Sequence, residues 1–242
     1  MKVVILCGGY GTRIRDVAEN IPKPMIPIGG LPILWHIMKY YAHWGHRDFI
    51  LCLGYRGQVI KEFFLNYKAL TSDFTLTLGD SGSNRYHNDH SESDWTVTLV
   101  ETGLQAMTGA RVRRVRRFVD DEENFLLTYG DCLGDIVLGG LIRFHQAHGR
   151  IMTVTGVRPP GRFGELMSDE QGMVSEFNEK PQATGGRISG GFFVCRRELF
   201  DYLDDNEKLV LEQAPMHKLV DDKQLMVFDH DGFWQPMDTY RE

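Results

Sequence analysis

Long apolar runs are missing from this sequence of 242 residues. No window approaches the ~20 apolar residues that a membrane-spanning helix needs, and the first apolar run ends at Cys7, too early for a secretory signal peptide. We therefore expect a cytoplasmic protein without a membrane partner. The other cysteines, Cys52, Cys132 and Cys195, are far apart and form no Cys-x-x-Cys pair, which argues against zinc and redox sites. All four are expected to be buried free thiols.

An excess of basic residues is also missing, because 27 Lys and Arg stand against 33 Asp and Glu, for a net charge of −6. A nucleic-acid-binding protein generally needs a basic surface, so no nucleic-acid partner is expected. In the one basic cluster, Arg111 to Arg117, valines at helical spacing (Val112, Val115 and Val119) predict an amphipathic helix with arginines on its solvent face. Arg111 differs, because backbone donors and a guanidinium at a helix start, behind Thr108, suit an anionic or carbonyl-rich ligand.

Several catalytic patterns are absent as well. No Ser-His-Asp set stands out, and neither a His-x-x-x-His pair nor a Walker loop occurs. The dinucleotide fingerprint fails because its third glycine is missing after Gly11, where the chain continues with Thr12 and Arg13. Hydride transfer and P-loop hydrolysis are therefore disfavoured. A reaction that needs no general base fits better, since a phosphate monoester, with a second pKa of about 6, is already an anionic nucleophile near neutral pH. Such a reaction depends on positioning and charge neutralisation.

Strand and helix patterns alternate along the chain, which predicts an α/β fold with a mostly parallel sheet and helices on both faces. The predicted strands are Val3–Cys7, Phe49–Leu53, Thr96–Val100, Asn124–Tyr129, Ile151–Val157, Met173–Asn178, Gly191–Cys195 and Gln224–Asp229. The predicted helices are Ile33–Trp44 and Gln58–Tyr67. The polar segment Ser81–Asp94 is expected to be an exposed loop or lobe. No internal repeat or long linker occurs, so residues 1–242 are predicted to form a single domain.

A glycine loop with a basic end follows the first predicted strand. Gly8, Gly9 and Gly11 allow backbone N–H groups to approach phosphate oxygens, and Arg13 adds positive charge. Lys23 stands between two prolines, Pro22 and Pro24, which restrict its backbone. Together these residues predict a cradle for a triphosphate, with positive charge where pyrophosphate would leave. The alternative is an ordinary turn.

Acidic residues follow two other segments of the chain. Asp131 comes directly after a buried strand, and in open α/β sheets the ligand crevice lies beyond the carboxyl ends of strands. Asp238 lies in the segment Phe233–Thr239. Two aspartates and substrate phosphates are a typical donor set for Mg²⁺. The segment Glu179-Lys180-Pro181 offers a lysine for a second phosphate and a glutamate for sugar hydroxyls, with an exposed turn as the alternative.

These motifs together resemble the sugar-1-phosphate nucleotidylyltransferases. Pro32–Met38, Pro159–Gly164 and Phe233–Thr239 narrow the resemblance to the members that use CTP and glucose 1-phosphate, and the likeness runs nearly end to end. It implies a Rossmann-like fold of the nucleotide-diphospho-sugar transferase type with a small sugar-binding lobe. It also implies Mg²⁺-dependent transfer of a cytidylyl group from CTP to α-D-glucose 1-phosphate, which yields CDP-glucose and pyrophosphate for polysaccharide biosynthesis. Relatives of this kind are homo-oligomers, trimers or hexamers.

The resemblance also assigns roles to individual residues. The catalytic residues would be Arg13, Lys23 and Asp131. The nucleotide would be bound by Leu6, Cys7, Gly8, Gly9, Tyr10, Gly11, Thr12, Arg13, Lys23, Thr108, Arg111 and Gly130. The sugar phosphate would be bound by Tyr129, Gly164, Glu179, Lys180, Ser189 and Gly190. The metal ligands would be Asp131 and Asp238.

Four residues depart from the family pattern. Cys7 replaces alanine, and Ala106 stands where a hydroxyl residue is usual. Cys132 replaces glycine and Ser189 replaces asparagine, both at the sugar side. Two alternatives therefore stay open. One is a nucleotidylyltransferase that uses UTP, dTTP or another sugar 1-phosphate. The other is a non-catalytic sugar-nucleotide-binding regulatory subunit.

Overall fold

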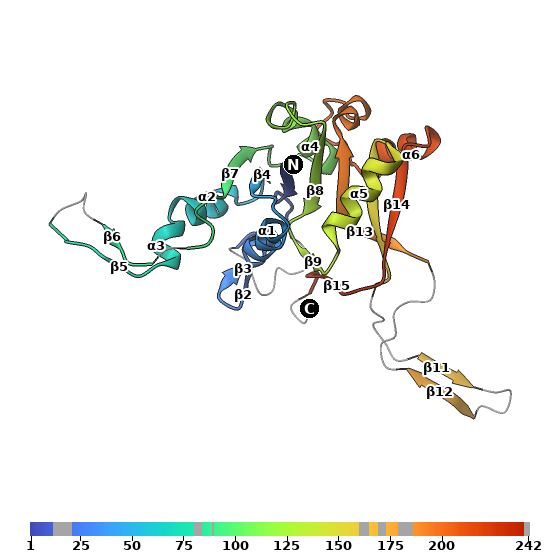
Figure 1. Ribbon diagram of the computed structural model, residues 1–242, viewed down its shortest axis with the longest axis horizontal. Coiled ribbons are helices and arrows are strands. Elements are labelled where there is room, and N and C mark those ends of the chain that lie inside the picture. The colour runs from blue at the N-terminus through green and yellow to red at the C-terminus, as the bar shows by residue number, and fades with distance from the viewer. Residues whose placement is uncertain are drawn as a thin grey trace.

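A seven-stranded sheet forms the centre of the computed structural model, which describes residues 1–11, 21–79, 84–88, 90–159, 165–168, 173–178 and 186–239. The strand order is β14-β10-β13-β8-β1-β4-β7 (Figure 1). These strands are β1 (Val3–Leu6), β4 (Asp48–Leu53), β7 (Thr96–Glu101), β8 (Asn124–Tyr129), β10 (Met152–Val157), β13 (Ile188–Arg196) and β14 (Leu225–His230).

The sheet is mostly parallel, as predicted. β1 is parallel to both β4 and β8, and β4 to β7. Only β13 runs antiparallel to both of its neighbours, β8 and β10. From β1 the chain builds β4 and β7 on one side and then returns to build β8 on the other, so the strand order reverses between β1 and β8. Ligands of open α/β sheets bind at such a reversal, beyond the carboxyl ends of the strands.

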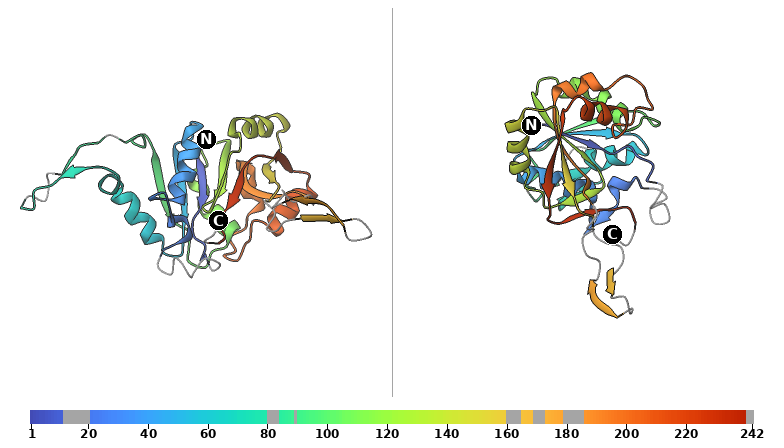
Figure 2. Two further views of the ribbon diagram at one scale, coloured as in Figure 1. Left: turned by 90° about the horizontal axis from the view of Figure 1, so that it is seen from below. Right: turned by 90° about the vertical axis from the view of Figure 1, so that its right-hand side faces the viewer.

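Helices cover both faces of the sheet, which confirms the predicted layering (Figure 2). One face is covered by α1 (Ile33–His43), α2 (Gly57–Leu65) and α5 (Leu138–His148), and the other by α4 (Thr108–Arg114) and α6 (Ala214–Asp221). Successive side chains of a strand point to opposite faces. Accordingly, Val3 and Ile5 belong to the core under α1, whereas Val4 and Leu6 belong to the core under α4.

Two predicted helices differ from the observed ones. The predicted helix Gln58–Tyr67 is divided, because α2 ends at Leu65 and α3 (Tyr67–Thr71) begins after Asn66, whose φ of −102° and ψ of 10° leave the helical region. The helix predicted over Arg111 to Arg117 begins earlier and ends at Arg114, followed by a 3-10 turn over Arg116–Phe118. Its apolar face is confirmed, since Val112, Val115 and Val119 are fully buried.

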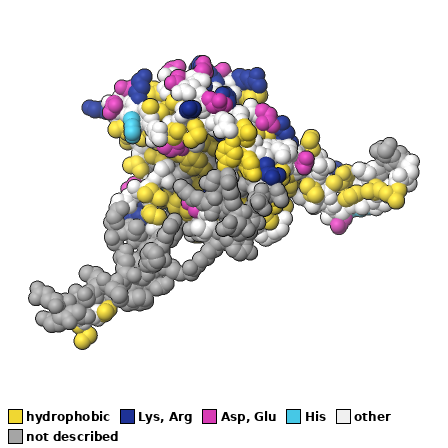
Figure 3. All heavy atoms as spheres, turned by 180° about the vertical axis from the view of Figure 1, so that it is seen from behind, with side chains coloured by type: hydrophobic (Ala, Val, Ile, Leu, Met, Phe, Trp, Pro, Cys, Tyr) yellow, Lys and Arg dark blue, Asp and Glu magenta, His cyan; other side chains and the backbone are white. Residues whose placement is uncertain are grey.

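Within the described ranges, four two-stranded sheets lie outside the main sheet: β2 (Pro27–Ile28) with β3 (Leu31–Pro32), β5 (Phe74–Thr75) with β6 (Arg85–Tyr86), β9 (Cys132–Gly134) with β15 (Trp234–Pro236), and β11 (Glu165–Ser168) with β12 (Val174–Asn178). The β5–β6 and β11–β12 hairpins project from the body (Figure 1). In its described part, the segment predicted as an exposed loop or lobe, Ser81–Asp94, therefore also contains the short strand β6. Apolar side chains gather on the β5–β6 arm, where Leu76 and Leu78 are exposed (Figure 3).

The cysteines behave as predicted. Cys7, Cys52, Cys132 and Cys195 are all buried and free. Burial raises the pKa of the Cys52 thiol to about 12, so this side chain is unreactive at neutral pH. Across the described ranges, no helix combines the length and apolar character needed to span a bilayer.

Candidate functional site

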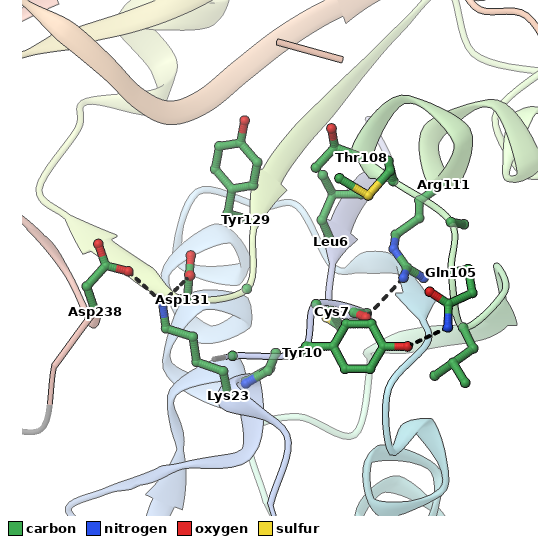
Figure 4. A pocket seen from close by; sticks show the side chains of 18 residues that line it. Leu6, Cys7, Tyr10, Lys23, Gln105, Thr108, Arg111, Tyr129, Asp131 and Asp238 are labelled. Atoms are coloured by element: carbon green, nitrogen blue, oxygen red, sulfur yellow. Dashed lines mark hydrogen bonds and ion pairs between the residues drawn. The ribbon is translucent and has the colours of Figure 1, made fainter. Parts of the chain in front are cut away.

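A cavity of about 430 Å³ lies at the carboxyl ends of β1 and β8, where the strand order reverses (Figure 4). Every predicted nucleotide-binding residue that the structure describes lines it: Leu6, Cys7, Gly8, Gly9, Tyr10, Gly11, Lys23, Thr108, Arg111 and Gly130. Tyr129, Asp131 and Asp238 line it as well. Residues predicted from separate motifs are therefore gathered around one space.

The structure does not place all of the predicted site residues at this cavity. Thr12, Arg13, Gly164, Glu179 and Lys180 lie outside the described residues. Ser189 and Gly190, at the beginning of β13, are described but are not among the residues that line the cavity. The Gly190 carbonyl accepts hydrogen bonds from Trp234 Nε1 at 2.7 Å and Cys132 Sγ at 3.8 Å. In this structure Gly190 therefore contacts Cys132, the residue after Asp131, and Trp234.

Lys23 contacts two carboxylates inside the cavity. It begins the 3-10 turn η2 (Lys23–Met25), in which Pro24 and Met25 are buried, so its backbone is anchored. Its Nζ lies 2.6 Å from Oδ2 of Asp131 and 2.9 Å from Oδ1 of Asp238 (Figure 4). Burial disfavours the lysine charge, but the two carboxylates outweigh this effect and raise the pKa of Lys23 above its ordinary value. Lys23 is therefore a cation at neutral pH.

Pairing of β9 with β15 brings the two aspartates together. Pro236 lies opposite Cys132 in this pairing, and Met237 N donates to Asp131 O at 2.8 Å. As a result Asp238 reaches the same cation as Asp131. No group of three or more His, Cys, Asp or Glu side chains suited to a metal occurs among the residues described. Two carboxylates that face one positive charge do fit Mg²⁺, a hard cation that keeps several waters and takes further oxygens from substrate phosphates.

Arg111 lies on the cavity wall, but its donors face the protein. It is 4% exposed and occupies the last turn of α4, which corrects its predicted place at the helix start. Its Nη1 donates to the carbonyl oxygens of Leu53 at 2.8 Å and Gly103 at 2.9 Å, and its Nη2 donates to that of Gly8 at 3.0 Å. A Cβ atom at Gly8 would lie only 2.2 Å from Nη1. The glycine thus admits the guanidinium, which fixes the loop that follows β1.

The start of α4 is also occupied by protein groups. Met107 N donates to Glu207 O at 2.9 Å, and Ala110 N donates to Leu209 O at 3.1 Å. Two of the backbone donors that would attract an anion to a helix start are therefore already used. The arginines predicted on the solvent face pair with acids: Arg113 with Asp205, Arg114 with Glu207 and Arg116 with Asp120.

Sequence reasoning missed the segment between β7 and α4. Leu104, Gln105 and Met107 line the cavity, and Gln105 Nε2 donates to the hydroxyl of Tyr10 at 2.9 Å (Figure 4). The Tyr10 ring also lies against Tyr55, with the ring centroids 5.2 Å apart. The hydrogen bond from Gln105 to Tyr10 joins the glycine loop to the opposite wall of the cavity. The rule that pointed to Asp131 could have found the segment, because it too follows the carboxyl end of a parallel strand.

The described part of the cavity wall suits anionic substrates. It contains glycine N–H groups, one lysine and two aspartates, and no histidine lines it. Burial raises the pKa of the Cys7 thiol well above its ordinary value, so Cys7 is no base at neutral pH. This arrangement can position phosphates and neutralise their charge, as expected for a reaction that needs no general base.

Comparisons with known proteins agree with this geometry. A family model described as nucleotidyl transferase matches residues 2–239. Glucose-1-phosphate cytidylyltransferase of Salmonella typhi is 49% identical over 243 residues, which cover 100% of this chain and 93% of that protein. Probable glucose-1-phosphate cytidylyltransferase of Bacillus subtilis (strain 168) is 44% identical over 241 residues, which cover 100% of this chain and 92% of that protein.

A solved structure shares the fold. HddC from Yersinia pseudotuberculosis superposes with a TM-score of 0.69 at 20% sequence identity, over 99% of this chain and 95% of that chain. At this identity the likeness concerns the fold alone. It places the mostly parallel sheet and its helical layers among known architectures.

Proposed function

The chain belongs to the nucleotidyl transferase family, and we propose that it transfers the cytidylyl group of CTP to α-D-glucose 1-phosphate, producing CDP-glucose and pyrophosphate. The observation that carries this assignment is the similarity over the whole chain to two glucose-1-phosphate cytidylyltransferases. The cavity supports it, because a glycine loop, a lysine and two aspartates converge where a triphosphate and a sugar phosphate would meet. The protein is thus an enzyme, a nucleotidyltransferase.

The reaction replaces one phosphoanhydride bond with another. A phosphate oxygen of glucose 1-phosphate attacks the α-phosphorus of CTP, and the bond from that phosphorus to the bridging oxygen of the β-phosphate breaks. The nucleophile is already anionic near neutral pH, so the protein needs no base to activate it. Its work is to align the two phosphates and to stabilise the negative charge that develops on pyrophosphate. In this proposal the backbone N–H groups of Gly8–Gly11 and the ammonium of Lys23, all of which line the cavity, would do that work.

Asp131 and Asp238 are the residues that would hold Mg²⁺. Their oxygens already face one cation, the Lys23 ammonium, at 2.6 Å and 2.9 Å, which shows that the pair accepts positive charge between its members. When bound, the ion would neutralise phosphate oxygens next to the reacting phosphorus. In this proposal the carboxylates orient the substrate phosphates, and Lys23 supplies fixed charge beside them.

Base recognition in this proposal falls to a small set of groups. Several backbone atoms of the glycine loop are already paired: Cys7 N with Cys52 O at 3.0 Å, and Gly8 O with Tyr55 N at 3.2 Å. Cytosine and uracil differ in a donor at position 4 and in the adjacent N3. A mismatched buried pair costs about 1–3 kcal/mol, so CTP should be preferred over UTP by roughly tenfold to hundredfold. Gln105, on the opposite wall of the cavity, is a candidate for hydrogen bonding to the base.

The residues that would bind the sugar phosphate are assigned by resemblance to the sugar-1-phosphate nucleotidylyltransferases. Tyr129 lines the cavity next to Asp131 and would contact the glucose unit of the sugar phosphate. Ser189 and Gly190 would contribute from the beginning of β13, and Gly164, Glu179 and Lys180 complete the proposed set. Four buried free thiols and a cytosolic nucleotide substrate favour the cytoplasm, where CDP-glucose would supply polysaccharide biosynthesis.

A homo-oligomer, trimer or hexamer, fits the exposed apolar side chains of the β5–β6 arm. Leu78 is 97% exposed and Leu76 is 44% exposed, and Phe74 lies beside them at 38%. Apolar groups gathered on a projecting arm mark an interaction surface. A second copy of the chain would cover them. Light scattering should show the oligomer for the native chain and a smaller species for Leu78→Asp.

A screen of pyrophosphate release tests the proposed function. CTP, UTP, dTTP, ATP and GTP are each combined with several sugar 1-phosphates, with Mg²⁺ present and absent. We expect the highest kcat/KM for CTP with glucose 1-phosphate. Equal turnover with UTP would overturn the cytidylyl assignment, and a higher kcat/KM with another hexose would overturn the sugar. Tight binding of CDP-glucose without any turnover would instead favour the regulatory subunit.

A further inference from the structure

Glu212, a residue outside the cavity wall, contacts two residues that form it. The hydroxyl of Tyr129 donates a hydrogen bond to Oε1 of Glu212, and the hydroxyl of Thr108 donates to Oε2 at 2.6 Å. Tyr129 ends β8, whereas Thr108 begins α4. One carboxylate therefore ties the end of β8 to the start of α4.

The segment that carries Glu212 is held firmly. Leu211 is fully buried, and Leu209 is 8% exposed. The carbonyl groups of Glu207 and Leu209 accept hydrogen bonds from the start of α4, and Leu211 N donates to Oγ1 of Thr108 at 2.9 Å. Since the backbone and the leucine side chains directly before Glu212 are anchored, and its carboxylate accepts two hydrogen bonds, the carboxylate has a fixed place.

The Tyr129 ring is fixed as well. A Cβ atom at Gly191, where φ is +77°, would lie 2.5 Å from Cδ2 of the ring, so only glycine leaves room for it. The ring also meets Phe193 edge to face, with the centroids 5.8 Å apart. Figure 4 shows the hydroxyls of Tyr129 and Thr108 pointing to the same side, away from Lys23. Both hydroxyls thus point away from the proposed metal end of the cavity.

Hydrogen-bond polarity follows from these contacts. A hydroxyl has one hydrogen, and in Tyr129 and Thr108 that hydrogen is directed to Glu212. Each oxygen can then only accept a further bond. Phosphate oxygens near neutral pH are also acceptors, so they gain nothing from these two groups. Sugar and ribose hydroxyls and the cytosine amino group are donors that such oxygens can bind.

We propose that Glu212 is a positioning residue that fixes Tyr129 and Thr108 as hydrogen-bond acceptors, so that the non-phosphate parts of the substrates bind on their side of the cavity. This inference rests on the proposed function for the identity of those substrates. It deepens that function by assigning the two hydroxyls to ligand hydroxyl or amino groups, whatever binds the phosphates.

Comparing two ligands tests this role. CDP-glucose carries hydroxyl and amino donors, whereas pyrophosphate with Mg²⁺ carries phosphate groups only. Calorimetry would measure both ligands on wild type, Glu212→Ala, Glu212→Gln and Tyr129→Phe, with Glu207→Gln as the control from the same segment. For both Glu212 variants we expect CDP-glucose affinity to fall about tenfold to hundredfold, with pyrophosphate affinity unchanged. Glutamine should not rescue, because its amide NH₂ donates to one hydroxyl and turns that hydrogen toward the ligand.

A double variant adds a second readout. If Glu212 acts through Tyr129, then Glu212→Ala with Tyr129→Phe should lose less affinity than the sum of the two single losses. Equal weakening of both ligands would mean general damage to the fold and would overturn the proposal, as would wild-type affinity for CDP-glucose in Glu212→Ala. If the wild-type screen yields another nucleotide sugar, the proposed function falls, and the same comparison is made with that product.

Discussion

Lys23 and Asp131 form an ion pair of 2.6 Å between Nζ and Oδ2, although 108 residues separate them in the chain. The same ammonium lies 2.9 Å from Oδ1 of Asp238. The side chain of Lys23 is 12% exposed, so its ammonium is largely shielded from water, whereas Asp131 and Asp238 are partly exposed. A positive charge thus lies between the two carboxylates that we propose as metal ligands.

Removing the lysine charge should reduce turnover steeply. We expect Lys23→Ala to lower kcat about 10²–10³-fold, because one preorganised electrostatic contact to the developing pyrophosphate charge is lost. Arg117→Ala is the matched control, since Arg117, in the 3-10 turn that follows α4, is exposed and lies over the ring of Phe118. Steady-state pyrophosphate release measures both variants. Similar losses of kcat in the two variants would show that Lys23 matters no more for turnover than an arginine at the surface.

Each aspartate should matter for metal binding. Asp131→Asn and Asp238→Asn keep the side-chain volume but remove one negative charge, so Mg²⁺ binds more weakly and the α-phosphate is misplaced. We expect both variants to fold, to need more Mg²⁺ and to lose most turnover, since a ~1 Å misplacement alone costs about a hundredfold. Mn²⁺ binding in the presence of CTP, followed by electron paramagnetic resonance, gives a readout independent of activity.

The double aspartate variant and a control complete this test. The double variant should be little worse than the worse single variant, because residues that act as one unit are not additive. Asp121→Asn should behave as wild type, since Asp121 pairs with Lys2 on the surface. Wild-type Mg²⁺ dependence in Asp238→Asn would remove Asp238 from the metal site.

Arg111 should act through the glycine loop. Its guanidinium spans carbonyl groups of three segments, which the single ammonium of Arg111→Lys cannot do. We expect this variant to raise KM for CTP at least tenfold and to lower the melting temperature. Arg113→Lys, whose wild-type arginine pairs with Asp205 at the surface, should change neither. An unchanged melting temperature with a raised KM would indicate direct contact of Arg111 with the nucleotide.

Sequence patterns within single segments predicted the strands that carry the site and the position of Asp131. The strand Asn124–Tyr129 is observed with its predicted bounds, because an apolar run of that length is typical of a doubly covered strand. The rule for carboxyl ends of parallel strands then placed Asp131 correctly at the cavity. The division of the second helix at Asn66 was missed, since helical spacing alone does not show where the backbone leaves the helix.

Contacts between distant segments could not be predicted in this way. Spacing does not tell whether the guanidinium of Arg111 faces a ligand or the carbonyl groups of its own protein. Glu212 carries no motif, and its importance arises only when β8 and α4 come together. The pairing of Lys23 with both aspartates likewise depends on the short β9–β15 sheet. Such contacts follow from the tertiary fold.

A buried histidine should make stability depend on pH. His145 is 1% exposed, and burial, with the charges of His148 and Arg196, lowers its pKa to about 4. Arg150 N donates to Nδ1 of His148, so Nε2 of His148 carries the hydrogen that is donated to Thr153. The Thr153 hydroxyl then donates to Nδ1 of His145 at 2.8 Å. This chain of bonds requires neutral His145, because a proton on Nδ1 would face the threonine hydrogen.

The sign of the effect follows from the two pKa values of His145. The folded value of about 4 lies below the unfolded value of 6.5, so the unfolded chain binds the proton first. Stability from neutral His145 is therefore complete above pH 6.5 and is lost as pH falls toward 4. The full difference corresponds to roughly 3 kcal/mol, of which about 2 kcal/mol is lost by pH 5.

Urea unfolding of wild type and His145→Gln at pH 7.5 and pH 5 would measure this loss of stability. We expect a smaller pH-dependent loss in His145→Gln and an unaltered one in His217→Gln, which changes an exposed histidine of α6. Equal losses in wild type and His145→Gln would assign the acid sensitivity to other groups.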